Sequence, residues 1–257
     1  MKTSKFNSFQ ILAFLSLFLT SIVVVAQPDD EDIEFFTDSD IKKSIIGLDL
    51  YATPNITSSN VLQAHRARID EQFSYLSNDN RGGFGMNYGL GLIIAPNRTL
   101  DFRLGVQYGV YSFQYNEVEV FDSNDQVVTT GTSNIDVTFI DVPIKMAFHQ
   151  ALGDKWEVEY GIGVEFNFLR DYTNTLQIEP NSFFDENSIE QNFTDSANVN
   201  NLTLSIQLGV NYRITPSLHL IFTPNFRYVF RSLVPNESQN QEAFYTIGAI
   251  TGLRYRF

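Results

Sequence analysis

Hydrophobic residues recur at every second position in eight stretches between residue 44 and residue 257. Alternation of this kind places successive side chains on opposite faces of a β-strand. In the last stretch, residues 243–257, Ile247 and Tyr255 fall on the apolar face, whereas Gly248 and Arg254 fall on the opposite face. The pattern predicts an all-β chain of eight antiparallel strands.

The lengths of the connections indicate how these strands are arranged. The predicted strands are about residues 44–53, 83–94, 99–114, 134–148, 155–169, 200–214, 218–231 and 243–257. The long connections are 54–82, 115–133, 170–199 and 232–242, and the short ones are 95–98, 149–154 and 215–217. Strict alternation of long and short is typical of an outer-membrane β-barrel, with short periplasmic turns and long external loops. We therefore predict an eight-stranded antiparallel transmembrane β-barrel located in the cell outer membrane.

The face opposite the apolar one carries most of the glycines and the charged residues of the strands. Eight strands enclose an interior just wide enough for side chains to fill, and large apolar residues from all eight would not fit there together. The apolar face therefore points to lipid, and the interior is predicted to be polar. The expected interior charge network has six acidic and six basic members: Asp49, Asp101, Arg103, Asp141, Lys145, Glu157, Glu159, Glu165, Arg213, Arg227, Arg254 and Arg256.

The equal numbers of acidic and basic residues in this network indicate whether the barrel is open or closed. Unpaired charge in the interior would cost several kcal/mol per ion, so we interpret the network as a salt-bridged filling that holds the barrel shut. The alternative is a small gated pore or a ligand-uptake barrel. A wide porin channel would take roughly 16 strands.

The N-terminal part of the chain has a different composition. Residues 1–26 carry Lys2 and Lys5 before an apolar run that ends in small residues, which predicts a secretory signal peptide; a signal anchor is the alternative. Residues 27–43 form an acidic periplasmic segment, expected to be solvated and mobile or to dock on a periplasmic partner. No later stretch reaches the roughly 18 to 20 apolar residues of a membrane helix. The barrel is thus expected over residues 44–257.

Composition narrows the set of partners. The formal net charge of −13 argues against nucleic acid, which would require a basic face. The chain has no cysteine, so disulfides and thiolate metal sites are excluded. The expected partners are outer-membrane lipid, the barrel-insertion machinery, and envelope proteins reached through the long external loops.

One segment resembles a known family. Residues 139–145 read FIDVPIK, which is similar to the aromatic or aliphatic-Glu-Ile-Pro-Leu-Leu-Leu-Lys segment of the PorT-like outer membrane protein β-barrel family. The stretches IIGLDLYATPN, YGLGLII, FTPNF and GLRYRF are also similar to that family, over about residues 44–257, whereas Asp141 stands where the family more usually has Glu. In the family the proline lies inside a barrel strand, so a β-bulge is expected at Pro143. The family's namesake is linked to type IX secretion and gliding motility, but no catalytic or ligand residue comes with the motif.

Candidate catalytic and metal-binding residues are few. Some eight-stranded outer-membrane barrels modify lipids with a histidine beside a serine or an acid. His65 is predicted in an external loop, His149 in a periplasmic turn, and His219 near the periplasmic rim, and none is expected beside such partners on the lipid-facing side. The segment Asp122–Asp125 lacks the glycine and terminal glutamate of an EF-hand loop, so it is expected to form a turn. No enzyme activity, cofactor or metal is predicted.

The third long connection contains four apolar residues that are expected to pack over the barrel mouth or to contact a partner. They are Phe183, Phe184, Ile189 and Phe193. Taken together, the patterns predict a non-enzymatic barrel that serves as a structural or accessory component of the cell envelope, with a secretion assembly as one setting.

Overall fold

The computed structural model describes residues 45–63, 67–69, 72–77, 80–97, 99–178, 188–230, 233 and 241–257. Its strands are β1 (Ile45–Gln63), β2 (Ala67–Arg68), β3 (Ser74–Ser77), β4 (Asn80–Ala95), β5 (Leu100–Phe121), β6 (Val127–Leu152), β7 (Trp156–Ile178), β8 (Ser188–Asn192), β9 (Asn200–Arg213), β10 (Leu218–Val229) and β11 (Gln241–Arg256). One 3-10 turn, η2 (Thr194–Ser196), precedes β9. The expectations for the signal peptide, the acidic segment, His65, Phe183 and Phe184 concern residues outside these ranges.

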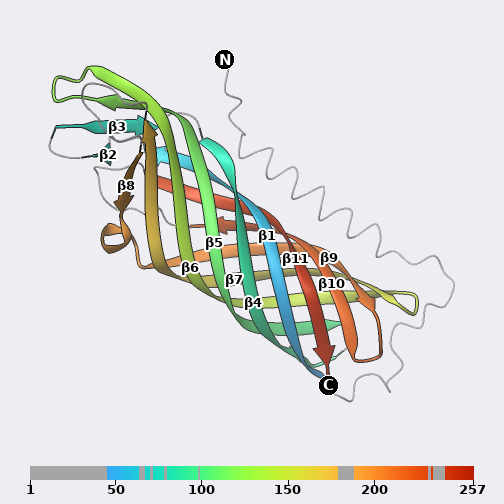
Figure 1. Ribbon diagram of the computed structural model, residues 1–257. Coiled ribbons are helices and arrows are strands. Elements are labelled where there is room, and N and C mark those ends of the chain that lie inside the picture. Colours follow the sequence, from blue (N-terminus) through green and yellow to red (C-terminus); the bar gives the residue numbers. More distant parts are fainter. Residues whose placement is uncertain are drawn as a thin grey trace. The chain divides into compact units, whose positions relative to one another are not determined.

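Eight of these strands form a closed antiparallel ring in the order β1-β4-β5-β6-β7-β9-β10-β11, with β11 pairing back to β1 (Figure 1). The ring confirms the predicted eight-stranded barrel. A closed ring has no open sheet edge, so the backbone polar groups of the wall pair with each other, as a lipid environment requires. Among the described residues, no helix is long and apolar enough to cross a membrane.

The two ends of the barrel differ. At the end that we call the turn end, short connections join β4 to β5, β6 to β7 and β9 to β10, and the backbone N–H of Phe257 donates to the carbonyl of Ile46 at 2.8 Å. At the opposite end, the hairpin end, β3 pairs with β5, β2 pairs with β3, and β8 pairs with β7. Figure 1 shows these three short strands gathered at the end away from the C-terminus.

The predicted long loops are partly wrong, because several strands run far beyond the predicted boundaries. The connection expected at 115–133 is mostly strand, since β5 continues to Phe121 and β6 begins at Val127. Likewise, β1 continues to Gln63 and β7 to Ile178. The outward residues of the β5 and β7 extensions are polar, so in these two strands the apolar alternation that marks a lipid-facing strand stops before the strand does.

Large apolar side chains cover the outside of the ring and remain exposed, as Leu90 does with 64% of its surface. At the turn end the aromatic rings of Trp156 and Tyr212 lie 4.8 Å apart, and those of Tyr255 and Phe257 lie 5.0 Å apart. An apolar band bounded by aromatic residues is the exterior of a barrel that faces lipid.

The β-bulge expected at Pro143 is absent. The β6–β7 pairing is continuous there, and the β5–β6 pairing omits Pro143 and Val142 without any change of register. A residue in an antiparallel strand directs its N–H toward only one neighbouring strand, so proline removes hydrogen bonds on that side alone. Pro224 behaves in the same way: it pairs with β11 but is omitted from the pairing with β9.

Candidate functional site

The interior of the barrel is filled by side chains that the inward positions of the eight strands bring together. Two clusters of charged residues lie one above the other, and a group of aromatic residues lies beyond them toward the hairpin end. The turn-end ion cluster comprises Asp49, Asp101, Arg103, His149, Glu157, Glu159, Arg254 and Arg256. The hairpin-end ion cluster comprises Asp141, Lys145, Glu165 and Arg227, together with Tyr111.

Glu159, on β7, is the central acceptor of the turn-end ion cluster. Its carboxylate accepts two hydrogen bonds from Arg103, at 2.7 and 2.8 Å, and one from Arg254 at 2.9 Å. The amides of Gln207 and Asn211 each donate to it at 3.0 Å. Glu159 is almost completely buried, so these donors replace the water that a carboxylate would otherwise bind.

Each of the two arginines also holds a second carboxylate. Arg103 binds Asp101 through Nε and Nη2 at 2.9 and 3.0 Å, and Arg254 binds Asp49 in the same way at 2.8 and 3.0 Å. Such paired contacts use the planar geometry of guanidinium and carboxylate and are among the stronger hydrogen bonds in proteins. They link β5, β7, β11 and β1 across the interior.

His149 lies at the edge of this cluster, on the inward face of β6. Its Nε2 is 2.6 Å from Asp101, and its Nδ1 is 2.5 Å from Glu157. Glu157 also pairs with Arg256 at 3.0 Å. The prediction that His149 lies in a periplasmic turn is wrong, because β6 continues to Leu152.

The hairpin-end ion cluster is centred on Arg227 of β10. Its guanidinium binds Asp141 at 3.0 Å and also contacts Glu165 and the hydroxyl of Tyr111. Lys145 pairs with Glu165 at 3.1 Å. Two positive and two negative groups therefore meet here, and the strands β5, β6, β7 and β10 are connected through them.

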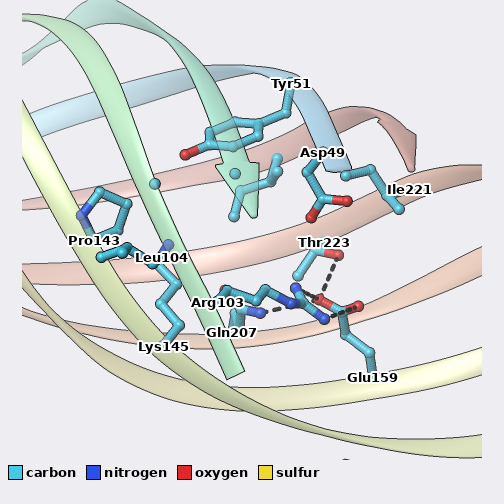
Figure 2. Close-up of a pocket in the computed structure, with 13 residues that line it drawn as sticks. Asp49, Tyr51, Arg103, Leu104, Pro143, Lys145, Glu159, Gln207, Ile221 and Thr223 are labelled. Carbon is cyan, nitrogen blue, oxygen red and sulfur yellow. Dashed lines mark hydrogen bonds and ion pairs between the residues drawn. The ribbon is translucent and has the colours of Figure 1, made fainter. Parts of the chain in front are cut away.

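A cavity of about 30 Å³ separates the two ion clusters. Figure 2 shows the ring of Tyr51 on one side of it, with Arg103 and Glu159 opposite and Lys145 beside Pro143. This volume has room for about one or two water molecules, since about 10 to 15 Å³ suffices for one. The bore is thus nearly filled at this gap.

Beyond the hairpin-end ion cluster the interior becomes apolar. The aromatic plug, as we call it, consists of Tyr111, Phe113, Tyr115, Phe139 and Phe244, whose neighbouring rings lie 5.8 to 6.3 Å apart. Buried aliphatic residues such as Val118 and Val137 extend it, and partly buried Ile189 and Phe193 pack against it. The prediction of a polar interior is therefore wrong at the hairpin end. For Ile189 and Phe193, the structure shows packing over the mouth, which was one of the two predicted outcomes.

The structure brings eleven of the twelve predicted network residues into the described ion pairs. Arg213 is the exception: it lies exposed at the end of β9. His149 and Tyr111 belong to the clusters but were not predicted there. In β5 and β6 the odd-numbered residues face the interior, and Tyr111 and His149 both have odd numbers. Extending this alternation along each strand could have identified them.

The segment Asp122–Asp125 forms the turn of the β5–β6 hairpin, as predicted. The Asp122 carboxylate accepts hydrogen bonds from the backbone N–H groups of Gln126 and Asn124, both at 2.9 Å. These bonds lower the pKa of the Asp122 carboxyl below its ordinary value, although the side chain is solvated. Within the described ranges, no three histidine or acidic residues are grouped as ligands of a metal ion.

A closed ring of eight tilted strands with a lipid-facing apolar exterior and a filled interior defines an eight-stranded transmembrane β-barrel of the outer-membrane type. Barrels of this type lie in an outer membrane, and we place the chain there.

Comparison with known proteins gives similarity in structure only. No protein-family model matches the chain, and a search of curated protein sequences finds no match. The outer membrane protease OmpT from Escherichia coli is 10% identical, with a TM-score of 0.40, over 88% of this chain and 100% of that one. A major outer membrane protein from Thermus thermophilus is 16% identical, with a TM-score of 0.38, over 80% and 99% of the two chains. The outer membrane protein OprG from Pseudomonas aeruginosa is 13% identical, with a TM-score of 0.36, over 84% and 97%. At these scores the likenesses carry no argument about activity, and the fold class rests on the hydrogen-bonded ring itself.

Proposed function

We propose that the chain is a non-enzymatic outer-membrane barrel whose interior is permanently filled, and that it serves as a structural or accessory component of the cell envelope. The observation that carries this proposal is the continuous filling of the bore. Two ion clusters, a gap of about 30 Å³ and the aromatic plug follow one another along it. A barrel filled in this way offers its wall and its ends for interaction, and no passage for solutes.

Within the described part of the chain, the histidine of the turn-end ion cluster is engaged in ion pairs. The carboxylate neighbours of His149, Asp101 and Glu157, are themselves held by Arg103 and Arg256. A substrate could not reach the imidazole without breaking those pairs. This geometry supports a structural role for His149.

The resemblance of residues 139–145 to the PorT-like family favours an envelope assembly, such as a secretion complex, as the setting. In that setting the turn end faces the periplasm and the hairpin end faces outward, as short turns and long strands do in barrels of this class. Affinity isolation of the tagged chain from membranes tests this part of the proposal. Recovery of the chain with no stoichiometric envelope protein would count against it.

A small gated pore is the second candidate, and the gap between the two ion clusters is the feature that favours it. Conductance in planar lipid bilayers separates the two. We expect no steady current from the wild-type chain. As a control, Arg227→Ala removes the bridge between β10 and β6 while leaving the aromatic plug in place, and we expect it to remain silent too. A steady current in the wild type that Arg227→Ala alters would establish the pore and refute the filled barrel.

A further inference from the structure

Three basic side chains, which we call the basic row, lie across neighbouring strands at the turn-end mouth of the bore. His219 of β10 pairs with Arg213 of β9 in the antiparallel register. The backbone N–H of Arg213 donates to the carbonyl of Lys155 at 2.7 Å, which continues the row to the residue before β7. Residues paired in this way have Cβ atoms about 4.5 to 5.5 Å apart on one face of the sheet. Odd-numbered residues of these strands face the interior, so the row borders the mouth of the bore.

Two members of the basic row have no counter-ion. Lys155 and Arg213 are exposed, and neither makes an ion pair within the described part of the chain. The exposed Asp154 in the adjoining turn makes no ion pair with either of them. Arg254 and Arg256, by contrast, are held by carboxylates of the turn-end ion cluster. The row therefore carries two positive charges that the interior does not neutralise.

His219, the third member, is buried but has no partner. Only 3% of its surface is exposed, yet its ring makes no hydrogen bond or ion pair with any described residue. It is paired with Arg213 on one side and with Arg254 on the other. Of the charged groups that act on the ring, three are guanidinium groups and one is the carboxylate of Glu157. A buried polar group without a hydrogen bond is costly, so the ring needs a partner that the chain does not supply.

A phosphate monoester matches the basic row in both charge and geometry. At neutral pH such a group carries a charge of about −1.5 to −2 and has three acceptor oxygens. The row offers an ammonium, a guanidinium and an imidazole N–H as donors, on three neighbouring strands. A carboxylate has one charge and two oxygens, so it would leave part of the row unpaired. We propose that Lys155, Arg213 and His219 bind the phosphate group of a phosphate monoester. Such a site needs only the folded barrel and is independent of the envelope role proposed above.

Two sources can supply this phosphate group. The rings of Trp156 and Tyr212 lie on the lipid-facing side of β7 and β9, so the basic row is level with the headgroups of the adjoining leaflet. Phosphatidic acid would present the group from that leaflet. A soluble phosphate monoester would reach the mouth of the bore from the aqueous side.

The test uses the full chain folded in phosphatidylcholine nanodiscs, with its histidine rings labelled with ¹⁵N. Inorganic phosphate is added at constant ionic strength, with acetate as the comparison anion, and the ring nitrogens are followed by NMR. The variant His219→Gln identifies the signal of His219, which we expect phosphate to shift saturably. Arg213→Gln should weaken binding about tenfold, the effect of losing one hydrogen bond to a charged group. Lys155→Gln, likewise at an exposed position, should show a similar loss. The matched control Arg170→Gln removes an exposed arginine near the hairpin end of β7 and should leave the affinity unchanged.

Nanodiscs that contain phosphatidic acid or phosphatidylglycerol distinguish the two sources. A shift of the His219 signal with phosphatidic acid, but not with inorganic phosphate, would support the site and assign it to a lipid. A shift with inorganic phosphate, but not with phosphatidic acid, would support the site and assign it to a soluble ester. The proposal is overturned if neither produces a saturable shift, or if acetate or phosphatidylglycerol produces an equal one. Equal weakening in Arg170→Gln and Arg213→Gln would also overturn it.

Discussion

Substitution of Glu159 by glutamine tests directly whether this carboxylate stabilises the barrel as the centre of the turn-end ion cluster. The change keeps the shape of the side chain but replaces one carboxylate oxygen by an NH₂ group. In the wild type, one oxygen faces Arg103 and Gln207, and the other faces Arg103, Arg254 and Asn211. Whichever way the amide turns, its NH₂ group faces an arginine N–H that the carboxylate had accepted, and the cluster loses one negative charge.

The expected loss in the free energy of unfolding depends on the carboxylate partners that each arginine keeps in the variant. Arg103 keeps Asp101 and Arg254 keeps Asp49, so neither guanidinium is left without a carboxylate. Removing one partner of a buried ion pair costs about 3 to 5 kcal/mol. Because both arginines remain paired, we expect the lower end, a loss of about 3 kcal/mol in the free energy of unfolding.

The assay is urea unfolding of the folded barrel in lipid vesicles, with Glu157→Gln as the matched control. Glu157 belongs to the same cluster and also contacts His149, but its side chain is 12% exposed and its arginine partner, Arg256, is 15% exposed. Water can compensate part of its loss, so we expect a cost of about 1 kcal/mol, in the range of partly solvated pairs. If Glu159→Gln destabilises the barrel no more than Glu157→Gln does, the central role of Glu159 is refuted.

Three further changes examine other parts of the barrel. Arg254→Glu should weaken the barrel more than Phe257→Leu, because it places a third acidic group between Asp49 and Glu159; equal heat-modifiability of the two variants on gels would contradict this. Tyr111→Phe removes the hydroxyl that contacts Arg227 and donates to Asp141 at 2.8 Å, and should cost about 1.5 to 3 kcal/mol in urea unfolding, whereas outward-facing Tyr108→Phe should be neutral. Gly89→Ala introduces a Cβ that would overlap the Tyr51 ring and should lower the free energy of unfolding by about 1 to 3 kcal/mol. The double variant with Tyr51→Leu should recover part of this loss, and strictly additive effects of the two changes would show that the two residues do not meet.

The ring of eight strands could be predicted because lipid imposes a strong signal on the outward face. Every strand that crosses the apolar band needs apolar residues at alternate positions, and these repeat without interruption from Leu100 to Val110 of β5. The strand order followed from the lengths of the connections. Neither inference depends on which inward residues meet.

The hairpin end could not be predicted in the same way. From Ser112 onward the outward residues are polar, so the alternation changes from apolar-outward to apolar-inward without any interruption of the strand. A pattern search that expects one apolar face interprets this change as the start of a loop. Phe113 and Tyr115 continue the inward parity of Gln107 and Tyr111 on the same strand. Only the folded barrel shows that these rings form a core with Phe139 of the paired strand β6 and with Phe244 of β11, which does not pair with β5.

The twelve predicted network residues had equal numbers of acidic and basic members, but this balance does not describe the interior itself. Arg213 has the inward parity of β9 but lies past the last layer of the barrel and is exposed, so it neutralises nothing inside. The hairpin-end ion cluster is neutral on its own, whereas the turn-end ion cluster has four carboxylates against three guanidinium groups. A protonated His149 would supply the missing charge: its ring nitrogens lie 2.6 Å from Asp101 and 2.5 Å from Glu157, and only the protonated imidazole has two N–H donors to offer. Neutrality of each cluster, and not of the whole interior, is what a low-dielectric bore requires, because a distant arginine cannot offset a carboxylate that is buried elsewhere.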